Sequence, residues 1–436
     1  MEILKFDLTK KAGKFKIMNA TNGGPWHRRN HATMQRSNFE EYKAARIPYF
    51  RNHDAGSQGI YGGPYAHDIS KIFRNFNADE NDPASYDFAC TDEAILTALD
   101  AGTNVFFRLG ESAEHNVIPH GAVPPADFSK WARIAEHIIR HYNEGWADGY
   151  RLNIEYWEIW NEPDLHRDNP KKGFWTGTDE MFFDFYEIAS KHLKSCFPDI
   201  KLGGPALAHD ARWAERFLAE MKRRNVPMDF FSWHIYCVEP ETMVGKAAII
   251  KDLLVKNGYE KAESILNEWN YVKSWGEDFV QSVLTIQGNK GAAFVMSCIS
   301  EMQKCDAVDM LMYYDTRPGV FCGAFDFYTC KPRKGYYPLM WYGKFYDMES
   351  EVRCEDAPEN IYTLCGIDEK GKVLCVVTNY SDDDASPAKD IKIDFGKEGK
   401  YEIYVVDDEK DGELVEVTER LEFTIKKHSF MLIKEV

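Results

Sequence analysis

The chain has 436 residues, of which 44% are hydrophobic and 28% charged, a balance typical of globular proteins. Its 53 lysines and arginines oppose 70 aspartates and glutamates, which gives a formal net charge of −17. A surface of this sign repels nucleic acid, anionic membranes and strongly acidic polysaccharides. We therefore expect no nucleic-acid or membrane partner and a neutral or weakly charged small substrate.

The N-terminal segment and the cysteines predict a cytoplasmic protein. Residues 1–20 lack the apolar core and cleavage site of a signal peptide. No apolar run approaches the roughly 20 residues that span a bilayer. The 10 cysteines occur without CxxC or metal-ligand spacing, so we expect them to be reduced core residues.

Between about residues 15 and 348, short apolar runs alternate with longer segments of helical period. Several of these runs are apolar on both faces, as in a parallel sheet that is covered by helices. We predict helices at 92–101, 127–142, 178–196, 211–224 and 292–304. The eight predicted strands begin at Phe15, Pro48, Asn104, Tyr156, Lys201, Asp229, Glu263 and Val308. This alternation predicts an α/β fold, a (β/α)8 TIM barrel over residues 15–348.

From residue 349 to 436 the pattern changes to short, often alternating apolar segments. Turn clusters such as SDDDAS and DEKDG separate them. This pattern predicts a C-terminal antiparallel β-sandwich as an accessory domain, and we expect the N-terminal strand within residues 1–10 to join it.

Two carboxylates stand where the active site of such a barrel lies, at the carboxyl ends of the strands. Glu162 in WNEP ends the fourth predicted strand, and Glu268 in NEW ends the seventh. These strands lie on opposite sides of an eight-stranded barrel, so the two side chains can face each other across its mouth. Glycoside hydrolysis needs this arrangement of a proton donor and a nucleophile or base. Other candidates at strand ends are His53, Asp54, Glu111, Asn161, His234, Tyr236, Tyr314 and Asp315.

No further motif indicates a cofactor or a metal. The sequence contains no GxGxxG, GxxxxGK[ST] or GxSxG. The loop histidines show no HxH or HExxH spacing; they are His27, His31, His67 and His120. We therefore expect neither a cofactor nor a metal ion.

The two acidic motifs resemble the acid/base and nucleophile motifs of clan A glycoside hydrolases. Within that clan the chain is similar to glycoside hydrolase family 39, the β-xylosidase family and its relatives. YFRNHD, LGGPAL and NVPMDFFSWHIY also resemble segments of that family, so the resemblance covers about residues 15–348. It implies a retaining, exo-acting hydrolase of a small oligosaccharide or glycoside, with a β-xyloside as the expected substrate.

The resemblance also implies roles for individual residues. Glu162 would be the general acid/base and Glu268 the nucleophile. Arg51 would sit against the nucleophile and keep it ionised, since a nearby cation favours the charged form of an acid. The remaining residues would bind the sugar: Asn161 at the hydroxyl next to the anomeric carbon, and His53, His234 and Tyr236 around the reacting ring. Tyr314 and Asp315 align only loosely with the family.

Two departures from the family pattern leave more than one sugar as a candidate substrate. Asn267 replaces the usual threonine before the nucleophile. The turn RLGESAEHN replaces an apolar, proline-containing turn and places Glu111, Ser112 and His115 near the expected sugar site. An arabinoside, another pentoside or a hexoside therefore stays an alternative substrate.

Structural roles of single residues, and other functions of the whole protein, are alternatives to the catalytic interpretation. Glu158 is expected to be a buried structural acid paired with a cation such as Arg51. Trp26 is the best candidate for stacking on a sugar, whereas Trp157 is expected in the core. A transglycosidase of the same mechanism and a carbohydrate-binding protein without turnover stay alternatives, and the formation of a homo-oligomer is left open.

Overall fold

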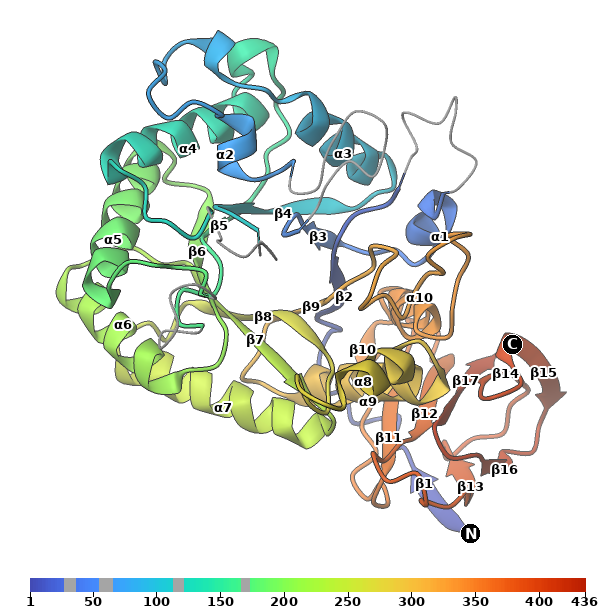
Figure 1. Cartoon of the computed structure of the whole chain (residues 1–436). Coiled ribbons are helices and arrows are strands. Elements are labelled where there is room, and N and C mark those ends of the chain that lie inside the picture. Colours follow the sequence, from blue (N-terminus) through green and yellow to red (C-terminus); the bar gives the residue numbers. More distant parts are fainter. Residues whose placement is uncertain (27–36, 55–65, 113–120, 166–172) are drawn as a thin grey trace.

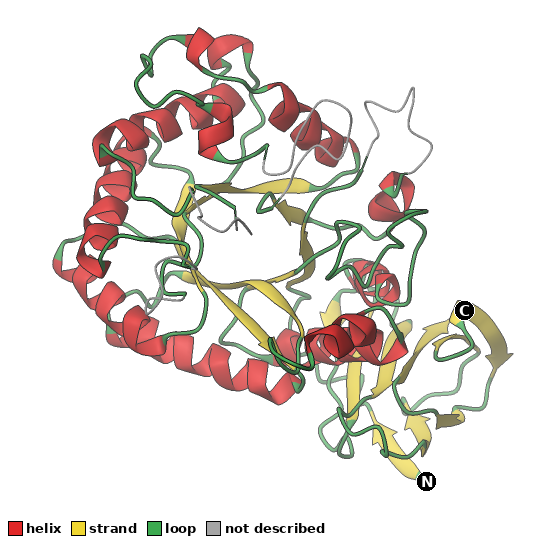
Figure 2. Ribbon diagram, viewed as in Figure 1, coloured by secondary structure: helices red, strands yellow, loops and turns green. Residues whose placement is uncertain are grey.

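The computed structural model describes residues 1–26, 37–54, 66–112, 121–165 and 173–436. A closed barrel forms the larger part, and two further sheets lie at one side of it, near both termini (Figure 1). Figure 2 shows the barrel strands as a ring with helices on its outer face. The predicted (β/α)8 barrel with a β-sandwich is confirmed.

All eight predicted barrel strands are confirmed, and every neighbouring pair is parallel. In barrel order they are β2 (Ile17–Asn22), β3 (Tyr49–Arg51), β4 (Asn104–Leu109), β5 (Tyr156–Ile159), β6 (Lys201–Leu207), β7 (Phe230–Cys237), β8 (Glu263–Tyr271) and β9 (Met310–Tyr313). The pairing of β9 with β2 closes the ring.

The five predicted helices are also confirmed, as α3 (Ala89–Asp100), α4 (Phe128–Asn143), α5 (Asp179–Cys196), α6 (Ala211–Arg223) and α9 (Asn289–Lys304). Asp127 caps α4 by accepting a hydrogen bond from the Lys130 amide, and Thr178 caps α5 in the same way. The described residues add α1 (Phe39–Ala44), α2 (Ile69–Ile72), α7 (Pro240–Lys256), α8 (Phe279–Ile286) and α10 (Tyr336–Phe345), with 3-10 turns at Pro83–Ser85 and Trp146–Asp148.

The interior of the barrel changes from apolar to polar along the strands. Its lower layer is a hydrophobic cluster made by Ala20, Phe106, Tyr156, Phe230, Ile265, Met310 and Met312. The next inward positions toward the carboxyl ends carry fully buried polar groups, among them Arg51, Glu158 and Asn267. The apolar layer therefore supports a polar floor on which the site is built.

The sandwich combines two sheets around a second hydrophobic core. The larger sheet is antiparallel and has the order β10 (Ser350–Glu351), β11 (Ile361–Ile367), β12 (Val373–Asn379), β17 (Ser429–Glu435), β14 (Tyr401–Val406) and β15 (Asp411–Thr418). The smaller one has the order β1 (Glu2–Lys5), β13 (Lys389–Asp394) and β16 (Glu422–Ile425).

The expected N-terminal strand does enter the sandwich, but one feature of its pairing was not predicted. β1 pairs with β13 in parallel, with Leu4 opposite Ile393, so this sandwich is not wholly antiparallel. Burial of apolar side chains explains this pairing of β1 with β13, because it places Leu4 and Phe6 in the sandwich core. The domain division at residues 348 and 349 stays a prediction.

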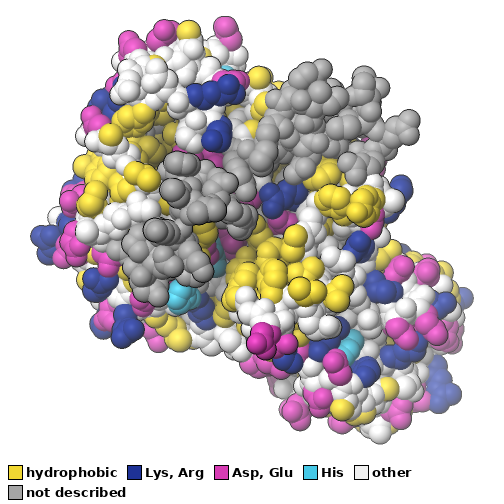
Figure 3. Space-filling view, viewed as in Figure 1, with side chains coloured by type: hydrophobic (Ala, Val, Ile, Leu, Met, Phe, Trp, Pro, Cys, Tyr) yellow, Lys and Arg dark blue, Asp and Glu magenta, His cyan; other side chains and the backbone are white. Residues whose placement is uncertain are grey.

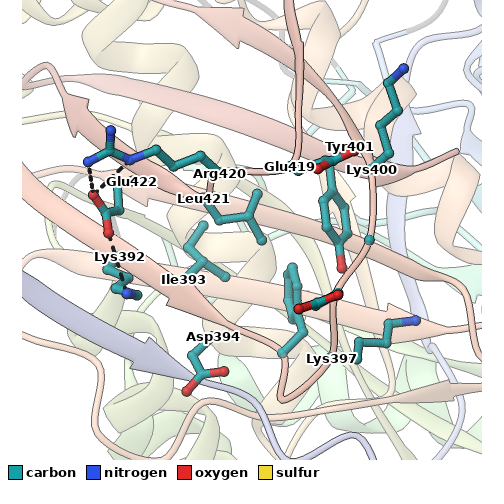
Figure 4. A pocket seen from close by; sticks show the side chains of 13 residues that line it. Lys392, Ile393, Asp394, Lys397, Lys400, Tyr401, Glu419, Arg420, Leu421 and Glu422 are labelled. Atoms are coloured by element: carbon teal, nitrogen blue, oxygen red, sulfur yellow. Dashed lines mark hydrogen bonds and ion pairs between the residues drawn. The ribbon is translucent and has the colours of Figure 1, made fainter.

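A shallow groove in the sandwich is separate from the barrel mouth. Charged side chains of β13, of the segment before β14 and of residues 419–422 around the start of β16 line most of it, including Lys392, Lys397 and Arg420 (Figure 4). Glu422 pairs with Arg420 at 2.5 Å and with Lys392 at 3.4 Å. None of these described lining residues belongs to the strand ends of the barrel.

No helix in the described ranges combines the length and the apolar character that crossing a membrane requires. The cytoplasmic location and the oligomeric state stay predictions.

Candidate active site

Arg51, at the end of β3, organises the polar floor of the barrel mouth. Its buried guanidinium donates through Nε to Oε2 of Glu158 at 2.6 Å and through Nη1 to Oε1 of Glu268 at 2.7 Å. Nη2 donates to Oδ1 of Asn161 at 2.7 Å. The predicted contact of Arg51 with the Glu268 carboxylate is therefore confirmed, and one cation holds both halves of the expected site together.

Glu158 is confirmed as a buried acid paired with Arg51. Besides the guanidinium, its Oε1 accepts hydrogen bonds from Ser232 Oγ at 2.5 Å and from Asn267 Nδ2 at 2.6 Å. Three donors satisfy this carboxylate, which is 0% exposed and has no open side toward a substrate. Asn267, the departure from the family pattern, thus serves to hold Glu158.

Glu268 lies on β8 opposite His234 of β7, at a register shift that places both on the inner face. Tyr236 Oη donates to its Oε2 at 3.0 Å, and His53 Nε2 lies 3.6 Å from its Oε1. Burial raises the pKa of Glu268, and the positive charge of Arg51 acts in the opposite direction. With Arg51 and Tyr236 as donors, this carboxylate is the better stabilised of the two in its ionised form.

Glu162 follows β5 in a left-handed backbone conformation, with φ at 48°. Its amide donates to the Ala206 carbonyl at 3.0 Å, which fixes the turn against β6. Burial, reinforced by the charge of Asp164, raises the pKa of Glu162 to about 8, although Arg51 opposes this. Glu162 is therefore protonated at neutral pH and can donate a proton.

His234 bridges the two carboxyl groups. Its Nδ1 lies 2.8 Å from Oε1 of Glu162 and 3.6 Å from Oε2 of Glu268. One oxygen of each glutamate and one nitrogen of this ring lie within 4.8 Å of one another. Retaining glycosidases have carboxyl groups about 5–5.5 Å apart, whereas inverting ones need about 6.5–9.5 Å. The nearest oxygens of the two glutamates lie closer together than the spacing of an inverting pair.

The two histidines of the site are neutral, and each has one ring nitrogen without a hydrogen-bond partner among the described residues. Burial lowers the pKa of His53 well below its usual value and that of His234 to about 4. Within the described ranges, Nδ1 of His53 and Nε2 of His234 are buried and have no hydrogen-bond partner. Buried polar atoms normally have one, so sugar hydroxyls are suitable partners here.

Tyr314 and Asp315, which follow β9, lie close to other residues of the barrel mouth. Tyr314 Oη donates to Oδ2 of Asp54 at 2.7 Å, and the Tyr314 ring lies 6.4 Å from that of Tyr236. Asp315 accepts from Arg317 Nη2 at 3.1 Å, and burial raises its pKa to about 6. These residues form the wall of the mouth at the end of β9.

Glu111 and Trp26 contact residues other than the two candidate catalytic glutamates. The carboxylate of Glu111 accepts from the amide and Oγ of Ser70 at the start of α2, at 3.0 and 2.6 Å. Burial and the nearby Asp68 raise its pKa to about 8. Trp26 is only 8% exposed, which leaves little ring surface for stacking, and its amide donates to Asn38. Their sugar-binding roles stay predictions, and His115 lies outside the described residues.

Arg108 was missed by the sequence reasoning. It lies on the inner face of β4, paired in register with Glu158, and its Nη2 donates to Oδ1 of Asp68 at 2.6 Å and to Ser112 Oγ at 2.9 Å. Within the described part of the chain, its buried Nε and Nη1 have no partner. A charged residue at the inward end of an apolar strand was the signal that could have found it.

Two groups of described residues have ligand types and distances that could hold a metal ion. One is Glu162, His234 and Glu268, and the other is Glu136 of α4 with His192 and Cys196 of α5. In the first group, Arg51 and Tyr236 already donate to Glu268. The expectation of no metal stays a prediction.

Known proteins resemble this chain in sequence and in fold. The model of Glycosyl hydrolases family 39 matches residues 33–299, more than half of the chain. A beta-xylosidase of Caldicellulosiruptor saccharolyticus is 29% identical over 177 residues, which are 39% of this chain and 34% of that protein. A beta-xylosidase of Geobacillus stearothermophilus is 28% identical over 196 residues, 42% of this chain and 36% of that protein. The matches thus span about a third of these curated relatives.

Among solved structures, a glucosidase from Croceicoccus marinus superposes with a TM-score of 0.81. Its sequence identity is 20%, and the alignment covers 100% of this chain and 99% of that one. At this identity the likeness shows the fold, with the sandwich included.

Proposed function

The chain belongs to family 39 of the glycosyl hydrolases, and we propose on that premise that it is a retaining, exo-acting glycoside hydrolase. The observation that carries the proposal is the placement of Glu162, Glu268 and His234 at the barrel mouth, where one side-chain oxygen or nitrogen of each lies within 4.8 Å of the others. Arg51 and the raised pKa of Glu162 give the two acids opposite protonation states. An acid and a nucleophile are thus available at the same pH.

In the first step, the ionised Glu268 attacks the anomeric carbon and forms a glycosyl ester. Glu162 protonates the glycosidic oxygen as the bond between this oxygen and the anomeric carbon breaks. Arg51 and Tyr236 hold the attacking carboxylate through its two oxygens. The side chain is therefore aligned before the substrate arrives.

In the second step, Glu162 acts as the base for an incoming water, which attacks the same carbon and releases Glu268. Formation of the ester removes the negative charge of Glu268, so the pKa of Glu162 falls and its ionised form becomes accessible. Two inversions restore the original configuration at the anomeric carbon.

A β-xyloside is the substrate that the two curated relatives support, since both are named beta-xylosidases. A hexoside is the second candidate, because the similar solved structure is named a glucosidase. The open donor atoms of Arg108 and the open nitrogen of His53 favour a richly hydroxylated ring, which they would hydrogen-bond.

The test is hydrolysis of aryl pentosides, hexosides and deoxyhexosides in both anomers by the wild type, Glu162→Ala and Glu268→Ala. Both variants should lose most activity. Azide should rescue Glu162→Ala on an activated aryl glycoside and yield a glycosyl azide of retained configuration, seen by NMR. Glu215→Gln, an exposed surface glutamate, is the control and should leave rates unchanged.

Normal activity of both variants would contradict the assignment of these two residues. No turnover of any glycoside by the wild type, together with sugar binding in calorimetry, would instead indicate a carbohydrate-binding protein. Product analysis at high acceptor-sugar concentration would separate a hydrolase from a transglycosidase.

A further inference from the structure

Aromatic rings form a continuous surface at one side of the barrel mouth, which we call the aromatic shelf. It consists of Tyr236, Trp275, Phe279 and Phe321. The ring of Trp275 lies 5.0 Å from Tyr236, 5.6 Å from Phe279 and 5.9 Å from Phe321. Phe321 is in turn 6.1 Å from Tyr236. Phe279 lies 5.8 Å from Phe321, so each ring is close to at least two others and the shelf is one packed unit.

The inner end of the shelf reaches the reacting groups. Tyr236 Oη donates to Oε2 of Glu268 at 3.0 Å. Phe321 also lies 5.7 Å from the ring of Tyr314, whose hydroxyl donates to Asp54. A group bound on the shelf is therefore continuous with a sugar at the nucleophile.

The outer end of the shelf is open to solvent. Trp275 is 61% exposed, and beside it on α8 Val280 and Leu284 are 68% and 58% exposed. Val280 and Leu284 are four residues apart and so lie on one helix face, and Val320, next to Phe321, is 57% exposed. Figure 3 shows hydrophobic side chains gathered over α8 beside the barrel mouth.

A purely structural role does not account for this exposure. An indole packed for stability would be buried, as Trp157 and Trp269 are at 0% exposure. Contiguous exposed apolar surface marks binding sites on soluble proteins. The lysine nearest in sequence, Lys273, is held away in an ion pair with Asp382 of the sandwich at 3.0 Å.

We propose that the aromatic shelf binds an apolar, ring-containing leaving group of the substrate, so that the enzyme is selective for glycosides of hydrophobic aglycones. This inference rests on the proposed function, because an exo-acting pocket holds the terminal sugar at the carboxylates and leaves the departing group to extend outward. The shelf runs along that outward path. Its aliphatic rim of Val280, Leu284 and Val320 offers no hydrogen-bonding side chain to a second sugar, which favours an apolar group.

The test compares Trp275→Ala with the wild type on two substrates that carry the cleaved sugar. One is the 4-methylumbelliferyl glycoside, and the other is the glycosyl fluoride, which has no aglycone. The variant should lose about tenfold in kcat/KM on the umbelliferyl glycoside, the scale of one stacked aromatic contact with its buried area. On the fluoride it should stay within about twofold of the wild type. Trp275→Phe should recover most of the loss.

Tyr328→Ala is the matched control, since Tyr328 is 73% exposed and its ring packs on Phe327, outside the shelf. It should behave as the wild type on both substrates. Equal losses of Trp275→Ala on both substrates, or no loss on either, would overturn the inference while leaving the hydrolase intact. A fall in sedimentation mass of Trp275→Ala would also overturn it, because the shelf would then be a contact between copies.

If the wild type cleaves none of the glycosides, the proposed function fails separately. The shelf is then tested by calorimetric binding of the 4-methylumbelliferyl glycosides to the wild type and to Trp275→Ala. Weaker binding by the variant supports a site for apolar aglycones, and equal or undetectable binding by both overturns it.

Discussion

Nδ1 of His234 lies 2.8 Å from Oε1 of Glu162, and this contact joins the proposed acid to the β7–β8 edge that carries the proposed nucleophile. Because burial lowers the pKa of His234 to about 4, the ring is neutral at the pH where Glu162 holds its proton. The ring therefore orients the carboxyl group by a hydrogen bond and contributes no charge.

The pH dependence of kcat/KM should be bell-shaped, with an alkaline limb near pH 8. The pKa of Glu162 is about 8, so its proton is lost, and activity with it, as the pH rises through that value. The acid limb should lie above pH 4.5, because burial raises the pKa of Glu268 from this value and protonation removes the nucleophile. Activity that persists unchanged to pH 10 would contradict the assignment of Glu162.

Replacement of His234 by Phe should slow the hydrolysis of each substrate in proportion to how much its leaving oxygen needs protonation. We expect a loss of about 10²-fold in kcat/KM for alkyl glycosides, the lower range for general acid catalysis, and a clearly smaller loss for dinitrophenyl glycosides. The reason is that a misoriented Glu162 fails only where the leaving oxygen needs protonation. A plot of log kcat/KM against leaving-group pKa should thus become steeper, and an unchanged slope would speak against this role.

Much of the fold follows from local pattern in the sequence. Short, largely apolar runs such as NVFFRL indicate strands buried on both faces, as in a parallel sheet covered by helices, and this run is a barrel strand. The parallel pairing of β1 with β13 could not be predicted, because it joins segments almost 390 residues apart through a short edge strand that carries no turn signal.

The site was predictable where strand ends define it and unpredictable where loops do. Glu162 and Glu268 meet because the carboxyl ends of parallel strands share one face of the barrel. Trp275 instead follows β8 in a loop, and its sequence context does not distinguish it from the buried Trp269 six residues earlier. Exposure of a ring depends on how segments remote in sequence pack around it, here the loop that carries Phe321.

Removal of the Arg51 guanidinium should destabilise the protein as well as inactivate it. Arg51→Met leaves Glu158 and Glu268 buried without their cation, which costs about 3–5 kcal/mol in the free energy of unfolding. Urea denaturation measures this loss. Arg46→Met is the matched control, because Arg46 is exposed and its pair with Asp347 should contribute below about 1 kcal/mol. Equal stability of the two variants would contradict the central position of Arg51.

Replacement of Asp164 should shift the alkaline limb of the kcat/KM profile toward lower pH. Its carboxylate accepts hydrogen bonds from the amides of Ala208, His209 and Asp210, at 2.8 to 2.9 Å, and so ties the turn after Glu162 to the start of α6. The negative charge of Asp164 is second only to burial in raising the pKa of Glu162.

Asp164→Asn removes this charge and keeps one carbonyl oxygen, which can still accept from the His209 and Asp210 amides that share one carboxylate oxygen. The pKa of Glu162 should then fall, because its ionised form no longer meets a neighbouring anion, and the alkaline limb of kcat/KM should shift below pH 8. Asp210→Asn is the control, since that side chain caps α6 through the Arg212 and Trp213 amides and is not a cause of the Glu162 shift. A limb that moves equally in both variants would mean that the turn, and not the charge of Asp164, sets the acidity of Glu162.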